Sequence, residues 1–77
     1  MTPEQCKAAR ALLRWTVKDL SDAANVGVNT ISFFEARSAP EREFRQRTIL
    51  ALRATLEAHG VEFLDGAAPG VRLHGAD

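Results

Sequence analysis

Side chains that could perform covalent or metal chemistry are few in this chain of 77 residues. Its one cysteine, Cys6, has no base close to it in the sequence, and its two histidines, His59 and His74, are far away. A metal site needs several clustered ligands, and a nucleophile needs a base that activates it. No pair of carboxylates stands at a spacing that indicates acid–base catalysis. We therefore expect no enzyme activity, no cofactor and no metal site.

Cys6 is expected to be a small core residue, because a single cysteine cannot form an internal disulfide. A reducing cytoplasm suits such a chain. Its first ten residues lack the apolar run of a secretory signal, and no apolar run approaches the ~18 residues of a membrane span. We expect a cytoplasmic protein with no membrane partner.

The charges cancel overall but are unevenly distributed. Residues 1–53 hold nine Lys and Arg against six acidic residues, a net charge of +3, whereas residues 54–77 hold one Arg against four acidic residues, a net charge of −3. Such a split indicates that the first part of the chain meets an anionic partner, although the solvated surfaces of many proteins differ as much.

Length and composition are typical of one small globular domain, since 45% of the residues are hydrophobic. A domain of this size buries only roughly 60% of the surface that its unfolded chain exposes, so its stability is marginal. A partner subunit is therefore expected.

Two capping boxes predict where the first two helices begin. Thr2 with Gln5 forms the first box, and Thr16 with Asp19 forms the second. The side chains expected to face inward are Cys6, Ala9, Leu13, Trp15, Leu20, Ala23 and Ala24. Those expected on the outer side of the first helix are Lys7, Arg10 and Arg14.

A tight turn is predicted at 25–27, because Asn25 and Gly27 tolerate the left-handed backbone conformation. Helical spacing resumes from Val28 to Arg37, with Ile31 and Phe34 facing inward.

The longest helix is predicted from Arg45 to His59, with Gly60 ending it. His59 then lies where a cation favours a helix C-terminus. After a polar turn at 40–44 and this helix, residues 61–63 and 71–73 alternate as two short strands do. The inward residues of the helix are Ile49, Leu52 and Leu56.

Two short helices joined by a three-residue turn match a helix-turn-helix, whose second helix enters the DNA major groove. Residues 15–37, WTVKDLSDAANVGVNTISFFEAR, resemble the Cro/CI-type (XRE) family of prokaryotic and phage regulators. The resemblance extends upstream to residue 9 and downstream over 58–63 and 69–73. It implies a mainly α, lambda-repressor-like fold with four to five helices in a DNA-binding domain, 1–60, and a short C-terminal β segment in 61–77. The departures from the family pattern are Ser21, Asn25, Gly27 and Arg37.

Helical spacing predicts which side chains of the second helix could read bases. With Ile31 and Phe34 facing inward, the opposite side of this helix faces outward. Asn29 can pair with adenine through two hydrogen bonds, and Val28 and Phe33 can contact thymine methyl groups. Ser32 can contact a base or a phosphate. Alternatively, Phe33 packs into a neighbouring loop.

Phosphate contacts are expected from residues that flank this helix and position the protein without reading sequence. Each of them has a solvated side chain as its alternative interpretation. These residues are Thr16 with its helix N-terminal amides, Lys18, Arg37, Arg42 and Arg45.

One recognition helix covers only a few base pairs, so a homodimer on a palindromic operator is expected. The candidate dimer surface is the apolar tail segment, and its alternative role is a hairpin that covers the core of its own chain. Its residues are Phe63, Leu64, Val71 and Leu73.

The function expected from these features is that of a sequence-specific transcriptional regulator, a repressor or a dual repressor and activator, in the prokaryotic cytoplasm. Its partner is double-stranded operator DNA, with an antagonist protein as a further partner. By resemblance, mobile genetic elements are a frequent setting. The alternative is a protein-interaction module on the same fold, such as an antitoxin or the partner of an antirepressor.

Overall fold

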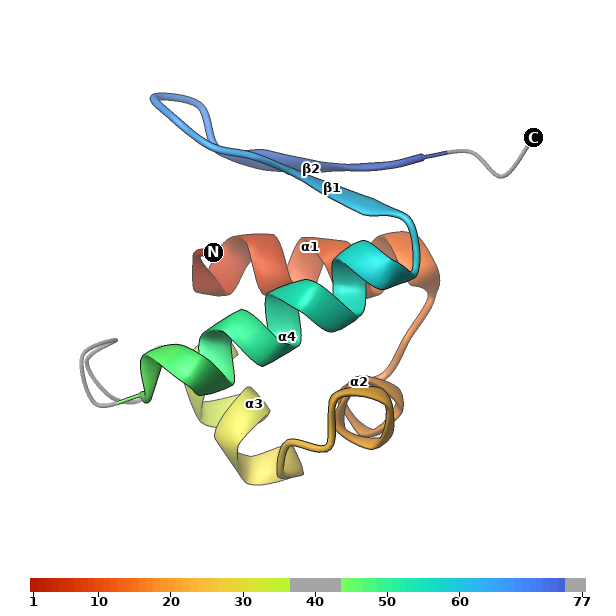
Figure 1. The fold of residues 1–77 in the computed structure, drawn as a ribbon, viewed down its shortest axis with the longest axis vertical. Coiled ribbons are helices and arrows are strands. Elements are labelled where there is room, and N and C mark those ends of the chain that lie inside the picture. The colour runs from red at the N-terminus through yellow and green to blue at the C-terminus, as the bar shows by residue number, and fades with distance from the viewer. Residues whose placement is uncertain (37–43, 75–77) are drawn as a thin grey trace.

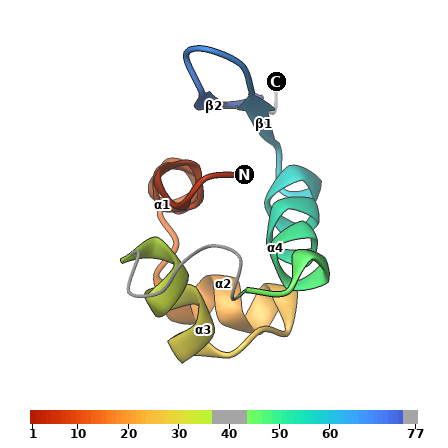
Figure 2. The same cartoon turned by 90° about the vertical axis from the view of Figure 1, so that its left-hand side faces the viewer.

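Two longer helices, α1 (Pro3–Leu13) and α4 (Gln46–Ala58), form the middle of the molecule. The shorter α2 (Val17–Ala24) and α3 (Val28–Glu35) lie at one end, and the strands β1 (Val61–Leu64) and β2 (Gly70–Leu73) lie at the other (Figures 1 and 2). This computed structural model describes residues 1–36 and 44–74. The predicted mainly α architecture with a short C-terminal β segment is confirmed, with four helices among the described residues.

Both predicted capping boxes are present. The Thr2 hydroxyl accepts the Gln5 N–H at 3.0 Å, and the Gln5 side-chain oxygen accepts the Thr2 N–H at 2.9 Å. Thr16 and Asp19 make the same reciprocal bonds at 3.1 and 2.9 Å. Each box satisfies two N–H groups that the first helical turn leaves without a partner.

The helix ends also follow local chemistry. Asn25 takes the left-handed conformation, with φ of 57°, and Gly60 follows α4 with φ of 99°. Arg14 ends α1 in the same left-handed region, with φ of 58°, which the sequence did not signal. The predicted bounds of α4 hold to within one residue, whereas α3 ends at Glu35, with Ala36 as its C-cap. Arg37, the last residue of the predicted range, and most of the 40–44 turn lie outside the described residues.

The core fills the space between the four helices and the hairpin. Ala23, predicted to face inward, is exposed. Val17, Leu20 and Ala24 lie within about 60° of one another on α2, and Ala23 lies about 90° from the centre of that arc. The fully buried apolar residues are Cys6, Ala9, Leu20, Ile31, Phe34, Leu52 and Leu56. The predicted core residues Leu13, Trp15, Ala24 and Ile49 pack against them and are half-buried.

The hairpin is fixed to α1 by the buried amide of Gln5. Strands β1 and β2 pair antiparallel, with Leu64 opposite Gly70 at the loop end. The Gln5 Nε2 donates to the carbonyl oxygens of both these residues, at 3.1 and 3.0 Å. One side chain thus caps α1 and holds the two strands. Of the two roles considered for the tail segment, the structure shows the intrachain hairpin.

Candidate nucleic-acid interface

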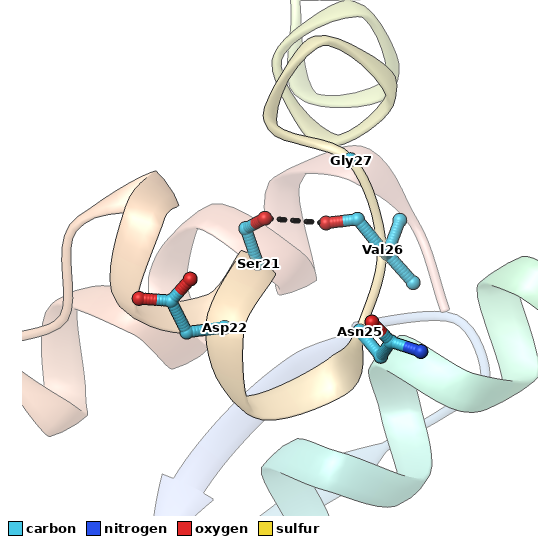
Figure 3. Close-up of a pocket in the computed structure, with 5 residues that line it drawn as sticks. All are labelled: Ser21, Asp22, Asn25, Val26 and Gly27. Carbon is cyan, nitrogen blue, oxygen red and sulfur yellow. Dashed lines mark hydrogen bonds between the residues drawn. The ribbon is translucent and has the colours of Figure 1, made fainter.

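The turn between α2 and α3 is held by Ser21 as well as by Asn25. The Ser21 carbonyl accepts the N–H of Asn25 and, at 3.2 Å, that of Val26. Its hydroxyl donates to the Val26 carbonyl, as the dashed line in Figure 3 shows. Figure 3 also shows the shallow pocket at this turn, which Asp22 and Gly27 help to line. The serine that departs from the family pattern therefore has a structural role, which is to fix the angle at which α3 leaves the turn.

The inner side of α3 is anchored in the core. Ile31 and Phe34 are fully buried, as predicted. The ring of Phe34 meets the ring of Phe44 edge-on, with centroids 5.4 Å apart. Because Phe44 precedes α4 by two residues, this contact brings the start of α4, with Arg45, next to α3.

The outer side of α3 is open to solvent. Val28 is 40% exposed and Phe33 is 53% exposed. Asn29 is also exposed, and Ser32 is half-buried. The structure thus brings the four predicted base-reading residues to one arc of a short helix.

The C-terminal end of α3 is tied to α1 by an ion pair that the sequence did not reveal. Glu35 accepts two hydrogen bonds from Arg10, at 2.6 and 2.8 Å, and the two side chains are only 8% and 15% exposed. Arg10 also donates to the Trp15 carbonyl at 2.9 Å. The prediction that Arg10 lies on the outer side of α1 is therefore wrong, because its guanidinium serves α3 and the connection to α2.

Cys6 joins this cluster as a hydrogen-bond donor. Its thiol donates to Glu35 at 3.2 Å, and the side chain is fully buried. Burial, followed by the bond to the carboxylate, raises the pKa of the Cys6 thiol far above its usual range. The hydrogen bonding of Arg10 itself to Glu35 raises the pKa of Arg10. The thiol is therefore protonated and unreactive in the folded chain, in agreement with its predicted core role.

The predicted phosphate-binding residues differ in whether their charges and hydrogen-bonding groups are already used within the chain. Lys18 is exposed and pairs with Asp22, 3.1 Å away and four residues on, in an ion pair that solvent weakens. Thr16 already uses its N–H and its acceptor oxygen in the capping box, which leaves its hydroxyl proton for a phosphate. Arg45 is exposed at the start of α4. The remaining two, Arg37 and Arg42, lie outside the described residues.

The predicted dimer surface is mostly turned toward its own chain. Phe63 is only 7% exposed, with the Arg53 guanidinium 5.0 Å from its ring centre, so it is core and not a free surface. Val71, paired with Phe63 across the hairpin, packs against the same core. Leu64 and Leu73 are the two members of the set that remain exposed.

The outer face of the hairpin is polar. Arg72 donates to Glu62 at 2.7 and 3.0 Å, and His74 lies 2.8 Å from the same carboxylate. The bonds from Arg72 hold the pKa of Glu62 below its usual value. Of the predicted dimer residues, Leu64 lies on this side, beside these charged groups.

His59 confirms its predicted place at the end of α4. Its ring nitrogen lies 2.8 Å from the Thr55 carbonyl, and the ring packs edge-on against Trp15.

Within the described parts of the chain, no three His, Cys, Asp or Glu side chains are arranged to hold a metal ion. Nor is any helix there long and apolar enough to cross a membrane. In comparisons with known proteins, no family model and no curated protein matches the chain.

Proposed function

We propose that this protein is a sequence-specific DNA-binding transcriptional regulator whose helix α3 enters the major groove. The observation that carries this proposal is the two-sided character of α3, which buries Ile31 and Phe34 and exposes Asn29 and Phe33. A helix of eight residues is about 12 Å long, and the major groove is about 12 Å wide. A rigid helix of this size can present its outer side to base edges.

The chemistry of that outer side favours A·T base pairs. The Asn29 amide can donate a hydrogen bond to N7 of adenine and at the same time accept one from the N6 amino group. Val28 and Phe33 suit the methyl group of thymine. Helix α3 contains no Lys or Arg, the side chains that most often read guanine. Ser32 completes the arc as a short donor or acceptor. We therefore propose half-sites with A·T pairs under α3.

Phosphate contacts position this helix in the proposal. Lys18 and Arg45 are exposed, and Thr16 retains a hydroxyl proton, so all three can contact the DNA backbone. The nearest acidic side chain of α3, Glu35, is neutralised by Arg10, so it does not repel phosphates. Arg37 and Arg42, which lie outside the described residues, belong to the same proposal.

The proposed architecture is that of the lambda-repressor-like, Cro/CI-type regulators, with 1–60 as the DNA-binding domain and 61–77 as a C-terminal arm. Two copies would read a palindromic operator with half-sites about 34 Å apart. Occupancy of an operator that overlaps a promoter is enough for repression, so repression is the proposed mode. Binding upstream would allow activation, and an antagonist protein would relieve either effect in the cytoplasm.

Selection from a random duplex library, followed by footprinting with the purified full chain, tests this function. We expect one enriched palindromic sequence, protected from cleavage, whose affinity falls as salt rises. Lys7→Ala is the matched control for the exposed cations, because Lys7 is exposed on α1, outside α2 and α3. Absence of any enriched sequence at low salt would contradict the proposal. A stable complex with another protein would then favour the protein-interaction module.

A further inference from the structure

The outer face of α4 carries an apolar stripe that no described element covers. Leu50 is 53% exposed, and Ala54 and Ala58, one and two turns further on, are exposed as well. Helical spacing places these three side chains within about 80° of one another. In Figure 1 α4 crosses the front of the molecule with no element drawn over it, and in Figure 2 it runs along one side with no other described element beyond it.

Charges of opposite sign stand at the two ends of this stripe. Arg47 is exposed one turn before Leu50, and Glu57 is exposed about one turn after Ala54. A helix face that is positive at one end and negative at the other is complementary to the same face turned end for end. The charges at the two ends of this stripe therefore fit a second copy of the same helix face.

We infer that the α4 outer face, made of Arg47, Leu50, Ala54, Glu57 and Ala58, docks a second copy of this chain in an antiparallel, two-fold arrangement. Helix α4 spans residues 46–58, so its midpoint is residue 52. Antiparallel pairing about this midpoint puts Arg47 opposite Glu57 of the second copy and Leu50 opposite Ala54 of the second copy. Two-fold symmetry makes each of these contacts occur twice.

Side-chain size favours the same arrangement. The small side chains of Ala54 and Ala58 let two helix axes approach to the short end of the usual 8–10 Å range, and Leu50 can then fill the space above an alanine. Glu57 already accepts a bond from Arg53, at 3.2 Å, through its Oε2 atom. Its Oε1 atom can accept from Arg47 of the second copy without breaking that bond.

The extent of the face predicts a weak dimer. Thirteen helical residues are only about 20 Å long, so one face of this helix buries less than the roughly 1,600 Å² of a standard stable interface. Self-association through α4 needs no DNA, so it stands apart from the proposed function. It would supply the two-fold partner that the hairpin, whose apolar side is buried in its own chain, does not offer.

Sedimentation equilibrium of the purified full chain without DNA, from about 10 µM to about 1 mM, tests the inference. We expect dimers at the upper concentrations, and Leu50→Asp should lower the association constant at least about tenfold by burying a charge against an alanine. Leu12→Asp is the matched control, because Leu12 is an exposed leucine on α1. Circular dichroism checks that each variant is folded.

Charge reversal supplies the sharper test. Arg47→Glu or Glu57→Arg alone should weaken association about fivefold, since each change removes two exposed ion pairs and creates two repulsions. The double variant should return to within about twofold of the natural chain, although the bond from Arg53 stays lost. A chain that is monomeric at about 1 mM, equal effects of Leu12→Asp and Leu50→Asp, or a double variant as weak as the single ones would each overturn the inference.

Discussion

The outer sides of α3 and α4 both expose apolar side chains but differ in charge. On α3 the exposed arc of Val28, Asn29 and Phe33 is neutral. On α4 the exposed stripe around Leu50 has a cation at one end and an anion at the other. A neutral arc with one amide suits the edges of the bases and the methyl group of thymine. The DNA phosphates are then contacted by cations outside α3. A stripe with charges of both signs suits another copy of itself.

The two faces also differ in how they are supported. Helix α3 is short and depends on the Arg10–Glu35 ion pair, on Ser21 in the turn, and on two buried aromatic or aliphatic side chains. Helix α4 is longer and buries Leu52 and Leu56 along its own length. The proposed DNA-reading face is therefore tied to a side chain of another helix, Arg10 of α1, whereas the α4 outer face lies on a helix anchored by its own buried leucines.

The largest expected effect comes from the anchor of α3. Arg10→Ala leaves the carboxylate of Glu35 buried without its partner, which should lower the free energy of unfolding by about 3–5 kcal/mol. Urea unfolding measures this, with Lys7→Ala as the control on the same helix. The pair of changes Arg10→Met and Glu35→Leu should restore most of the loss, since no buried charge then remains. A loss below about 1 kcal/mol for Arg10→Ala would show that the ion pair does not support α3.

The next effect separates the two faces directly. Asn29→Ala should weaken binding to the preferred operator by about 1–3 kcal/mol and relax the preference for adenine at one position. It should leave self-association unchanged, because Asn29 is remote from the α4 outer face. Fluorescence anisotropy on operators that differ in single base pairs measures the first result, and sedimentation measures the second. An equal loss on every operator would mean that Asn29 contacts a phosphate.

A smaller effect concerns pH and also belongs to the α3 side. The folded pKa of Cys6 is raised above that of a free thiol, about 8.5, so its contribution to stability is complete below that pH and is lost as the pH rises. The free energy of unfolding should fall by up to about 1.4 kcal/mol per pH unit above about 8.5. Urea unfolding between pH 7 and 10 measures the slope. Cys6→Ser, which cannot titrate in this range, should lack this component, and equal slopes in both chains would contradict the assignment.

The smallest effect concerns a single phosphate contact. Lys18→Ala should weaken binding to all DNA sequences alike and reduce the slope of log affinity against log salt by about 1. Stability should change by at most about 0.5 kcal/mol, because the ion pair with Asp22 is exposed. Titrations at several salt concentrations measure the slope, and Lys7→Ala should leave it unchanged. A change in base preference would assign Lys18 to base reading.

Features encoded locally could be predicted from the sequence. The capping residues, Asn25 in the turn and Gly60 after α4 each act within a few neighbouring residues, so their residue types are sufficient evidence. The inward positions of Ile31 and Phe34, and the exposure of Asn29 and Phe33, followed from the period of the helix.

Long-range partners could not be predicted. Arg10 comes four residues after Cys6, so helical spacing places both on the inner face of α1. Its charge nevertheless favoured an exposed position. The sequence does not show that Glu35, 25 residues further on, is its partner in the folded chain. The apolar residues of the hairpin have the same alternation whether they cover their own core or a partner. Phe63 was therefore placed at a dimer surface although it is buried.

The bond pattern of Gln5 has a consequence for how the chain matures on the ribosome. Its amide lies in the first turn of the first helix, yet the carbonyl groups that it serves belong to residues 64 and 70. Nearly the entire polypeptide must therefore be translated before this helix can settle into its final packing. Folding in vivo is expected to be completed late and as a single event, with no stable amino-terminal half formed ahead of it.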